Sequence, residues 1–306
     1  MSMGPDTIVV RMLPGGRRLS LRHGPIDLIV EAMGNPADVE GAYEQATVVF
    51  PNILGELAGE LSQLRAPADT PKLAASGQVA RTMIATAKEF SRIAFVTPMI
   101  CVAGAVAEYV LASMVRDRSL DRAYVNNGGD IALYLAQGQG FDVGVCANPS
   151  SGAITSVAQI SERGGIGGIA TSGRRGRSHS LGIADAVTVL AATAAEADAA
   201  ATLIANAVDL PGHEGIVRTP ANQLSPDSDL ANRLVTIDVA SLTCAEVSQA
   251  LSAGQLLAQD LIGTGQIIAA YGSLQGFSFS TQDCGADAIR AAPKTNHTQL
   301  ERNEYA

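Results

Sequence analysis

The segment Gly168–Val208, GIATSGRRGRSHSLGIADAVTVLAATAAEADAAATLIANAV, decides the fold of this chain. It begins with a small, polar turn, and Ala186–Leu190 follows as a β-branched, apolar run that is typical of a short buried strand. From Ala194 the composition changes to alanine, which has the highest helix propensity of all residues. The segment therefore predicts a turn, a strand and a helix in succession.

The predicted helix carries two oxygen-bearing side chains on one face. Asp198 and Thr202 stand four residues apart, so they leave the same side of the helix one turn apart. Each also has an ordinary explanation, because aspartate is common on the solvent face of a helix and threonine can bond back to a carbonyl one turn earlier. Helix and turn together form the best candidate site, in which the polar residues of the turn are Ser172, Arg174, Arg177, Ser178 and His179.

A second polar turn lies upstream, between two apolar runs. Asn127-Gly128-Gly129-Asp130 separates Ala123–Val125 from Ile131–Leu135, and Asn-Gly is a strong signal for a tight β-hairpin. Before it, Phe95–Val115 is a helical run of small and apolar residues, in which Gly104 lets a ligand or another backbone approach closely. Helix packing in the core requires the same small residues, so both interpretations stay open.

The overall composition excludes one large class of partners. The chain has 306 residues, of which 47% are hydrophobic and 17% charged, and its mean hydropathy is +0.18, as expected of a globular protein with a large core. Its 21 basic and 30 acidic side chains give a net charge of −9, and it has no tryptophan. Phosphate contacts need clustered lysine and arginine, and base stacking needs aromatic side chains, so we expect no nucleic-acid partner.

The cysteines and the N-terminal sequence indicate where in the cell the protein is expected. The four cysteines lie far apart without zinc-ligand spacing, which predicts reduced thiols in a cytoplasmic protein. The N-terminal sequence MSMGPDTIVVRMLPGGRR has no apolar core behind a basic start, so no signal peptide is expected. No apolar run approaches the length that spans a bilayer, so no membrane contact is expected either.

The remaining segments complete the expected architecture. Asn35-Pro36 is typical of a helix start, and the helix that follows should be interrupted at Pro51. Residues 213–228 are polar and predict a loop. Since hairpin signals outnumber strand–helix–strand crossovers, we expect one α+β domain over residues 1–282, with mixed, mostly antiparallel sheets covered by helices. The polar tail over 283–306 has no apolar period and should be disordered.

Two blocks of the sequence, CVAGAVAEYVLASMV…AYVNNGGDIALYL and ATSG…SHS…ADAVTVLAATAAEADAAAT, resemble the ApbE superfamily, which contains FAD:protein FMN transferases. The chain is most similar to a shorter, uncharacterised branch of that superfamily. In that branch a PM-x-x-VAGA-x-AE block, an NGGD turn and an ADA-x-AT helix recur in this order. The resemblance covers residues 95–210 and implies an ApbE-like fold.

The resemblance also implies a set of site residues. In the transferases a helix aspartate, a threonine four residues later and a backbone carbonyl of the glycine–alanine block bind Mg²⁺; here these would be Asp198, Thr202 and Ala103. The turn Asn127–Asp130 would lie beside the flavin or its phosphates, and His179 would lie near the transferred phosphate. Mg²⁺ and FAD or FMN are the cofactors that the resemblance implies.

Three features differ from the transferases. His179 is followed by Ser-Leu-Gly-Ile-Ala-Asp instead of a DPRTG-like segment, and Ala107 stands where the transferases have a lysine. Their long flavin-gripping N-terminal segment is not recognisable. The scaffold is therefore kept, whereas the apparatus that binds the flavin donor is reduced.

One hypothesis is an enzyme, a transferase or hydrolase, with a reshaped ApbE-like site that acts on a small anionic metabolite or a flavin nucleotide. Arg174 and Arg177 would hold the anionic group, and His179 would move a proton. Ser172 or Ser178 would act as the nucleophile.

Two further hypotheses remain open. One is Mg²⁺-dependent FMN transfer from FAD, or hydrolysis of the FAD pyrophosphate. The other is a non-catalytic protein that binds a flavin or another metabolite in the same cleft. The small-residue helices would also suit packing between the subunits of a homo-oligomer.

Overall fold

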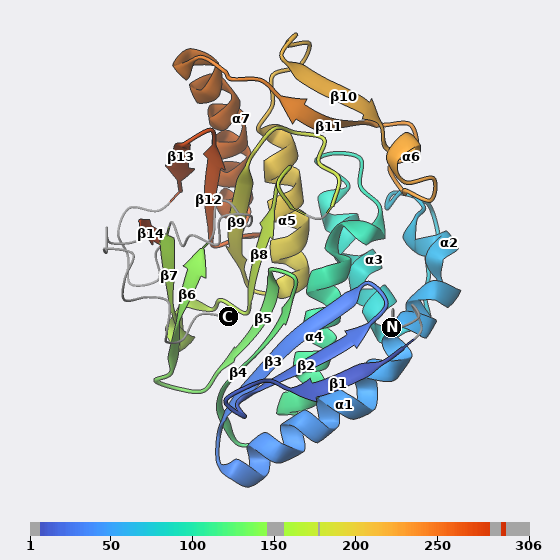
Figure 1. The fold of residues 1–306 in the computed structure, drawn as a ribbon, viewed down its shortest axis with the longest axis vertical. Helices are drawn as coiled ribbons and strands as arrows, with labels where there is room; N and C mark the ends of the chain where they lie inside the picture. Colours follow the sequence, from blue (N-terminus) through green and yellow to red (C-terminus); the bar gives the residue numbers. More distant parts are fainter. Residues whose placement is uncertain (1–6, 146–155, 177, 282–288, 292–306) are drawn as a thin grey trace.

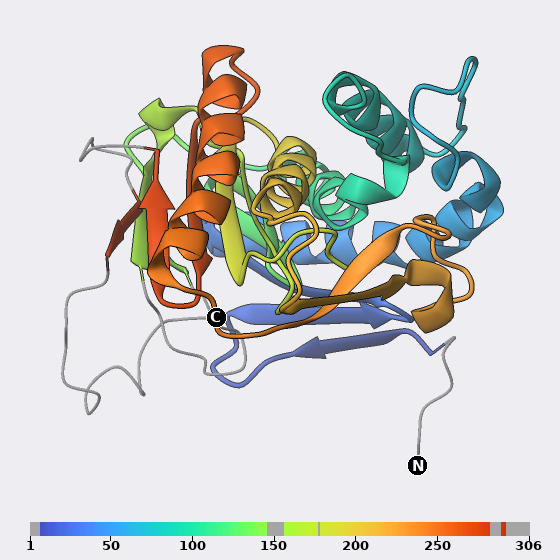
Figure 2. The same cartoon turned by 90° about the horizontal axis from the view of Figure 1, so that it is seen from above.

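The computed structural model describes residues 7–145, 156–176, 178–281 and 289–291. In this part of the chain the strands form a nine-stranded sheet, a three-stranded sheet and a two-stranded ribbon, and all their pairings are antiparallel. Helices cover one face of the large sheet (Figures 1 and 2). The expected α+β class, with mostly antiparallel sheets covered by helices, is confirmed.

The large sheet has the strand order β1-β2-β3-β4-β5-β8-β9-β12-β13. Its strands are β1 Val9–Met12, β2 Arg18–His23, β3 Ile26–Gly34, β4 Leu120–Asn127, β5 Asp130–Leu135, β8 Gly168–Ser172, β9 Ala186–Ala191, β12 Ala269–Leu274 and β13 Phe277–Ser280. The small sheet contains β6 Gly140–Val145, β7 Ser156–Ser161 and β14 Ile289–Ala291, and the ribbon contains β10 Ile216–Pro220 and β11 Leu234–Val239. Because β5 pairs with β8, the two polar turns predicted from the sequence lie in neighbouring parts of one sheet.

Three of the described α-helices, α1 Pro36–Gly59, α5 Ala194–Ala207 and α7 Cys244–Gly263, begin at a residue whose side chain caps them. The other described α-helices are α2 Leu61–Leu64, α3 Gln78–Phe90, α4 Val102–Val115 and α6 Ala221–Leu224, with the short 3-10 helices η1 Pro98–Cys101 and η2 Glu162–Gly164. The Asn35 side chain accepts a hydrogen bond from the first turn of α1, and Thr193 does the same for α5. These caps satisfy amides that a helix leaves unpaired, so the helix start expected at Asn35-Pro36 is confirmed.

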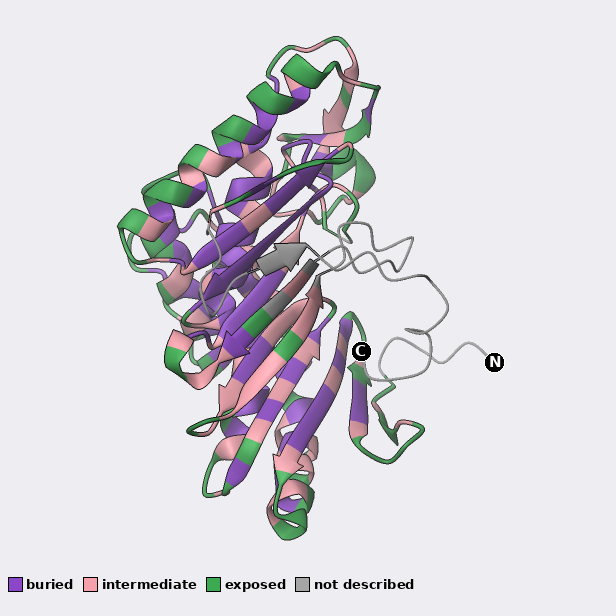
Figure 3. Ribbon diagram, turned by 90° about the vertical axis from the view of Figure 1, so that its left-hand side faces the viewer, coloured by how far each residue is buried: buried purple, intermediate pink, exposed green. Residues whose placement is uncertain are grey.

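Buried apolar side chains lie on both faces of the large sheet. Ala132, Ala170 and Val189 belong to the core beneath the helices, whereas their chain neighbours Leu133, Ile169 and Leu190 belong to a second cluster. Successive residues of a strand point to opposite faces, so the second cluster lies on the far side. Phe141 and Val143 of β6 pack against it, and the centre of the sheet is buried along most of its length (Figure 3).

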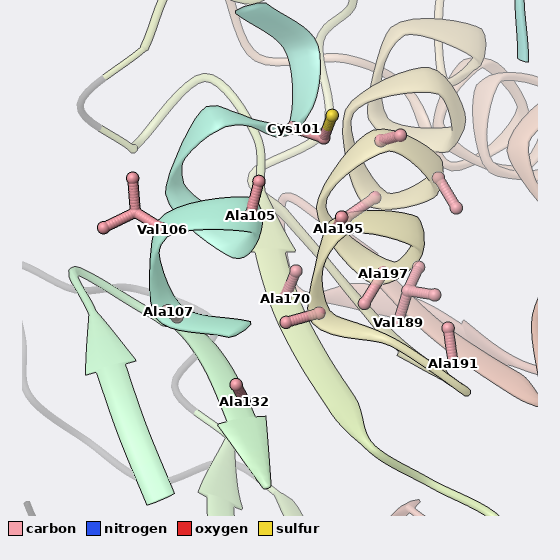
Figure 4. Close-up of a cluster of buried hydrophobic side chains, with 14 of the residues drawn as sticks. Cys101, Ala105, Val106, Ala107, Ala132, Ala170, Val189, Ala191, Ala195 and Ala197 are labelled. Carbon is pink, nitrogen blue, oxygen red and sulfur yellow. The ribbon is translucent and has the colours of Figure 1, made fainter. Parts of the chain in front are cut away.

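Helices α4 and α5 lie side by side at the centre of the helical layer, with small side chains between them (Figure 4). A Cβ atom on Gly104 would lie 2.2 Å from the carbonyl oxygen of Ala194, so only glycine fits where the two backbones meet. The packing interpretation of Gly104 is therefore confirmed.

The interruption predicted at Pro51 is wrong. Helix α1 continues through this residue from Pro36 to Gly59. An interior proline costs a helix about 3 kcal/mol, because one hydrogen bond is lost and the ring crowds the preceding turn. Phe50 and Ile53 are 0% and 1% exposed, and the burial of this face in the core offsets that cost.

Two other local predictions are also wrong. Thr171 and Ser172 are not part of a turn: they end strand β8, paired with Thr188 and Val187 of β9. Residues 213–228 are not one loop, because they contain β10 and α6. The polar residues of this segment favour a loop, but pairing with β11 stabilises β10 as a strand. Because the two strands are distant in sequence, local patterns do not indicate this pairing.

The expectation that no run could span a membrane needs a correction. By length and composition alone, Pro98–Val115 is apolar and long enough to do so, although 56% of this window is buried inside the protein. Cys101 and Cys244 are free thiols, and Cys146 and Cys284 lie outside the described residues. The polar tail expected over 283–306 lies outside them too, apart from β14.

Candidate functional site

Several candidate residues meet where α4, α5 and the β4–β5 turn come together. Oδ2 of Asp198, on the second turn of α5, accepts a hydrogen bond of 3.0 Å from the amide of Gly104 in the first turn of α4. An aspartate of one helix therefore caps the other helix, at the end where the helix dipole favours a negative charge.

The Asp198 carboxyl is strongly perturbed. Only 9% of the residue is exposed, and burial raises the pKa of this carboxyl well above its usual range. The nearby carboxylate of Asp130 raises the pKa further, whereas the amides of Gly104 and Ala103 lower it by bonding to the charged form. Two carboxyl groups thus share a poorly solvated site, where a cation would be strongly attracted.

The β4–β5 turn is tied to the same helix start. Gly128 and Gly129 have φ values of 69° and 116°, which a tight hairpin requires and glycine allows. The amide of Gly129 donates to Oδ1 of Asn126 at 2.9 Å, and Nδ2 of Asn127 donates to the carbonyl oxygen of Ala103 at 3.1 Å. The hairpin expected here is confirmed, and it holds the carbonyl that the resemblance implied as a metal ligand.

Thr202 lies one helical turn beyond Asp198 and contacts the end of β8. Its hydroxyl donates to Oγ of Ser172 at 3.2 Å, which leaves the lone pairs of the Thr202 oxygen available. The Ala103 carbonyl uses one of its two lone pairs for Asn127, so it also keeps capacity for a second partner.

These donors suit a hard cation. Carboxylate, hydroxyl and carbonyl oxygens are the ligands that Mg²⁺ prefers, and Asp198, Thr202 and Ala103 supply one of each kind. Within the described ranges, no three His, Cys, Asp or Glu side chains gather in a group that could hold a metal. A cation at this position would therefore depend on the hydroxyl and the carbonyl as well as on the carboxylate.

The arginines of the turn share a carboxylate that sequence reasoning missed. Arg174 and Arg175 each lie 2.8 Å from Oδ1 of Asp185, and Oδ2 of Asp185 accepts a hydrogen bond of 2.6 Å from the amide of Gln275. Arg177, the other arginine expected to hold an anion, lies outside the described residues. Two guanidinium groups face one carboxylate, so a net positive charge remains. Nε of Arg174 is buried and has no hydrogen-bond partner there.

The histidine of the turn has a partner that the sequence did not suggest. Nε2 of His179 lies 3.1 Å from Oγ of Ser225, in the residue that follows α6. Ser178 is exposed, and Ser172 bonds to Thr202 instead. The structure thus links His179 to a third serine, 46 residues away, and no local pattern could have indicated this pair.

Glu108 is a further, half-buried acid on α4. Its Oε2 accepts a hydrogen bond of 3.4 Å from the amide of Ala195 at the start of α5, and burial raises the pKa of this carboxyl. Helices α4 and α5 therefore cap each other, through Asp198 in one direction and Glu108 in the other. Two sequence features indicate these acids. Glu108 is an acidic residue inside an otherwise apolar run, and Asp185 is an acidic residue directly before a buried strand.

Comparison with known proteins places these residues in a family context. A family model described as AbpE bacteria matches residues 10–282, which includes every candidate residue named above. Two solved structures share low sequence identity with the chain. They are the flavin transferase ApbE from Vibrio cholerae (12% identity, 89% of this chain and 97% of that one, TM-score 0.47) and the apo flavinyl transferase ApbE from Pseudomonas stutzeri (12% identity, 92% and 98%, TM-score 0.49).

Curated relatives are more similar over a shorter region. A UPF0280 protein of Methanothrix thermoacetophila is 42% identical over 120 residues, which are 39% of this chain and 48% of the relative. A UPF0280 protein of Methanothermobacter thermautotrophicus is 42% identical over 122 residues, which are 40% of this chain and 46% of the relative. The chain thus spans about half the length of the curated relatives it matches.

Proposed function

The chain belongs to the AbpE bacteria family, and on that premise we propose that it is a Mg²⁺-dependent enzyme acting on the phosphate groups of a flavin nucleotide such as FAD. The observation that carries the proposal is the pair of carboxyl groups formed by buried Asp198 and half-buried Asp130, beside the Thr202 hydroxyl and the Ala103 carbonyl. The two solved structures compared above are flavin transferases, so the flavin is the nucleotide to test first.

A divalent cation accounts for the charges in this site. Two carboxyl groups in a poorly solvated place would repel the phosphates of a nucleotide. Asp198, Thr202 and Ala103 would hold Mg²⁺, which when bound offsets this negative charge and keeps coordination positions for phosphate oxygens. Asn127 and Ser172 would keep the Ala103 carbonyl and the Thr202 hydroxyl in place.

The turn after β8 would supply the positive and proton-carrying groups. The net positive charge of Arg174 and Arg175 against Asp185 attracts an anion, and the unpartnered Nε of Arg174 is free to donate a hydrogen bond to it. His179 would donate a proton to the departing phosphate oxygen or accept one from the attacking hydroxyl, since an imidazole can act in either role. The nucleophile is the hydroxyl of a second substrate or of water.

Thermal unfolding with ligands tests the proposal directly. The melting temperature is measured with FAD, FMN and small carboxylates, each with and without Mg²⁺. A ligand at a hundredfold its dissociation constant stabilises the folded state by about 2.7 kcal/mol, and we expect a shift of this size with FAD only when Mg²⁺ is present. Release of FMN or AMP, followed by chromatography, then separates an enzyme from a binding protein.

Other outcomes favour the other hypotheses. A shift with small carboxylates but none with flavins would replace the flavin by a small anionic metabolite. Binding of FAD that needs no Mg²⁺ and yields no product would identify a non-catalytic flavin-binding protein. Asp142→Asn, a neutralised and exposed aspartate on β6, serves as the control for loss of charge alone.

A further inference from the structure

An arm formed by residues 216–239 stands apart from the large sheet. It consists of β10, α6, the following loop and β11, and it lies at the upper edge of the molecule in Figure 1. Four large apolar side chains of the arm are between 48% and 53% exposed, namely Val217, Leu224, Leu234 and Ile237. Val239 and Ile216 join the arm to the main core, whereas these four side chains leave much of its outer surface apolar and exposed.

The base of the arm is anchored beside the Arg-Ser-His turn. The amide of Thr236 donates to the carbonyl oxygen of Ser180 at 2.8 Å, one residue after His179. Arg218 of β10 bonds to the carbonyl oxygen of Leu181 and pairs with Asp209. The arm thus has a fixed position relative to the turn.

The loop of the arm contacts both the turn after β8 and the segment that leads into η1 and α4. Ser225 lies 3.1 Å from Nε2 of His179, on the turn side. On the α4 side, Oδ2 of Asp229 accepts a hydrogen bond from the hydroxyl of Thr97, which caps η1. The guanidinium carbon of Arg233 lies 3.2 Å from the ring centroid of Phe95, a cation–π contact that strengthens the same attachment.

We propose that this arm completes the site and that Ser225 is a positioning residue for His179, an inference that rests on the function proposed above. A hydrogen bond at Nε2 restricts rotation of the imidazole, and its loss would shift the equilibrium between the two imidazole tautomers. Proton exchange with a bound nucleotide would then use Nδ1. The contacts of Asp229 and Arg233 hold the loop on the opposite side, so that Ser225 keeps its place.

The test compares three variants. Ser225→Ala removes the hydroxyl, Ser225→Thr retains it, and Gln223→Ala is the control, since Gln223 is exposed on α6 and bonds to Thr219 within the arm. The ¹⁵N chemical shifts of the imidazole report the tautomer without any need for activity, and His179→Gln assigns the signal. We expect Ser225→Ala to change the tautomer ratio of His179, and Ser225→Thr and Gln223→Ala to leave it unchanged.

Turnover of FAD with Mg²⁺ provides the second readout. We expect Ser225→Ala to lower kcat about five- to tenfold, the size of one hydrogen bond, at an unchanged KM, and Ser225→Thr to restore it. Unchanged imidazole shifts in Ser225→Ala would overturn the proposal. If the wild-type protein neither binds nor turns over FAD, the proposed function fails, while the imidazole shifts still decide whether Ser225 positions His179.

Discussion

The two walls of the candidate site are built in different ways. At the α4–α5 junction the backbones touch at Gly104 and Ala194, and the helices cap each other through the side chains of Asp198 and Glu108. The arm of residues 216–239 packs on the core at its base, through Val239 and Ile216, and its loop contacts His179 and Thr97 through single side-chain hydrogen bonds. One wall is therefore fixed by packing, whereas the loop of the other depends on a few polar contacts that can be removed singly.

The largest effect is expected at the junction. Gly104→Ala places a methyl group 2.2 Å from the carbonyl oxygen of Ala194, where only backbone movement can relieve the clash. Overpacking of this kind costs 1–3 kcal/mol and sometimes more, so we expect a loss of about 3 kcal/mol in the free energy of unfolding. Urea denaturation followed by circular dichroism measures it.

Gly55→Ala is the matched control for this substitution. Gly55 lies inside α1, and a Cβ atom there would meet nothing within 4 Å. Alanine in an unobstructed helix position stabilises by about 0.5–1 kcal/mol, so the two variants should change stability in opposite directions. Equal effects would mean that the contact between α4 and α5 does not limit the space at Gly104.

The second prediction separates stability from ligand binding at the junction. In the protein without added metal, Asp198→Asn should raise the melting temperature at neutral pH. The raised pKa of Asp198 means that the folded state binds its proton more tightly than the unfolded state, so wild-type stability falls as pH rises above the usual value of 3.8 towards the folded pKa. Asparagine carries no charge, so its burial does not lower the stability in this way, and its side-chain oxygen can still accept the hydrogen bond from Gly104.

The same variant should lose the Mg²⁺-dependent stabilisation by FAD, about 2.7 kcal/mol under the conditions given above. Melting curves from pH 4 to pH 8, with and without Mg²⁺ and FAD, measure both effects. If the variant has a higher melting temperature without ligands but is still stabilised by Mg²⁺ and FAD together, Asp198 does not bind the metal. Asp142→Asn should leave both quantities unchanged.

The difference between local and long-range contacts explains which features could be predicted from sequence. The helix carrying Asp198 and Thr202 and the hairpin at Asn127-Gly128-Gly129-Asp130 follow local rules of propensity and turn chemistry, and both were recognised. Strand β10 and the partner of His179 depend on pairings between distant residues, which no local pattern encodes. The position of Asp185 directly before a buried strand is a local signal, but its pairing with Arg174 and Arg175 requires the chain to return from the turn.

A smaller effect is expected on the arm. Asp229→Ala leaves the hydroxyl of Thr97, a residue that is 2% exposed, without its acceptor. We expect a loss of about 1 kcal/mol in the free energy of unfolding, together with faster hydrogen exchange of the amides in η1, which Thr97 caps. Asp227→Ala, an exposed aspartate in the same loop, should change neither. Exchange that accelerates equally in both variants would show that Asp229 does not hold the arm.

The smallest effect is expected far from both walls, at the start of α7. Glu246 and Thr243 form a capping box, and His213 lies 3.1 Å from Oε1 of Glu246. The backbone and side-chain hydrogen bonds from Thr243, followed by that from His213, lower the pKa of Glu246 from its usual value of 4.5 to about 2. The stability that these bonds contribute is therefore present above pH 4.5 and is lost as pH falls towards 2.

Glu246→Gln tests this contribution, because glutamine keeps the shape of the capping box but does not titrate. We expect the melting temperatures of the two proteins to differ slightly at pH 6 and to converge as the pH is lowered from 4.5, since protonation removes the charge from the wild-type side chain as well. If the difference in melting temperature stays constant over this pH range, the shape of the Glu246 side chain, and not its charge, provides the stabilisation by the capping box. Since α7 forms neither wall of the site, FAD-dependent stabilisation should be the same in both proteins.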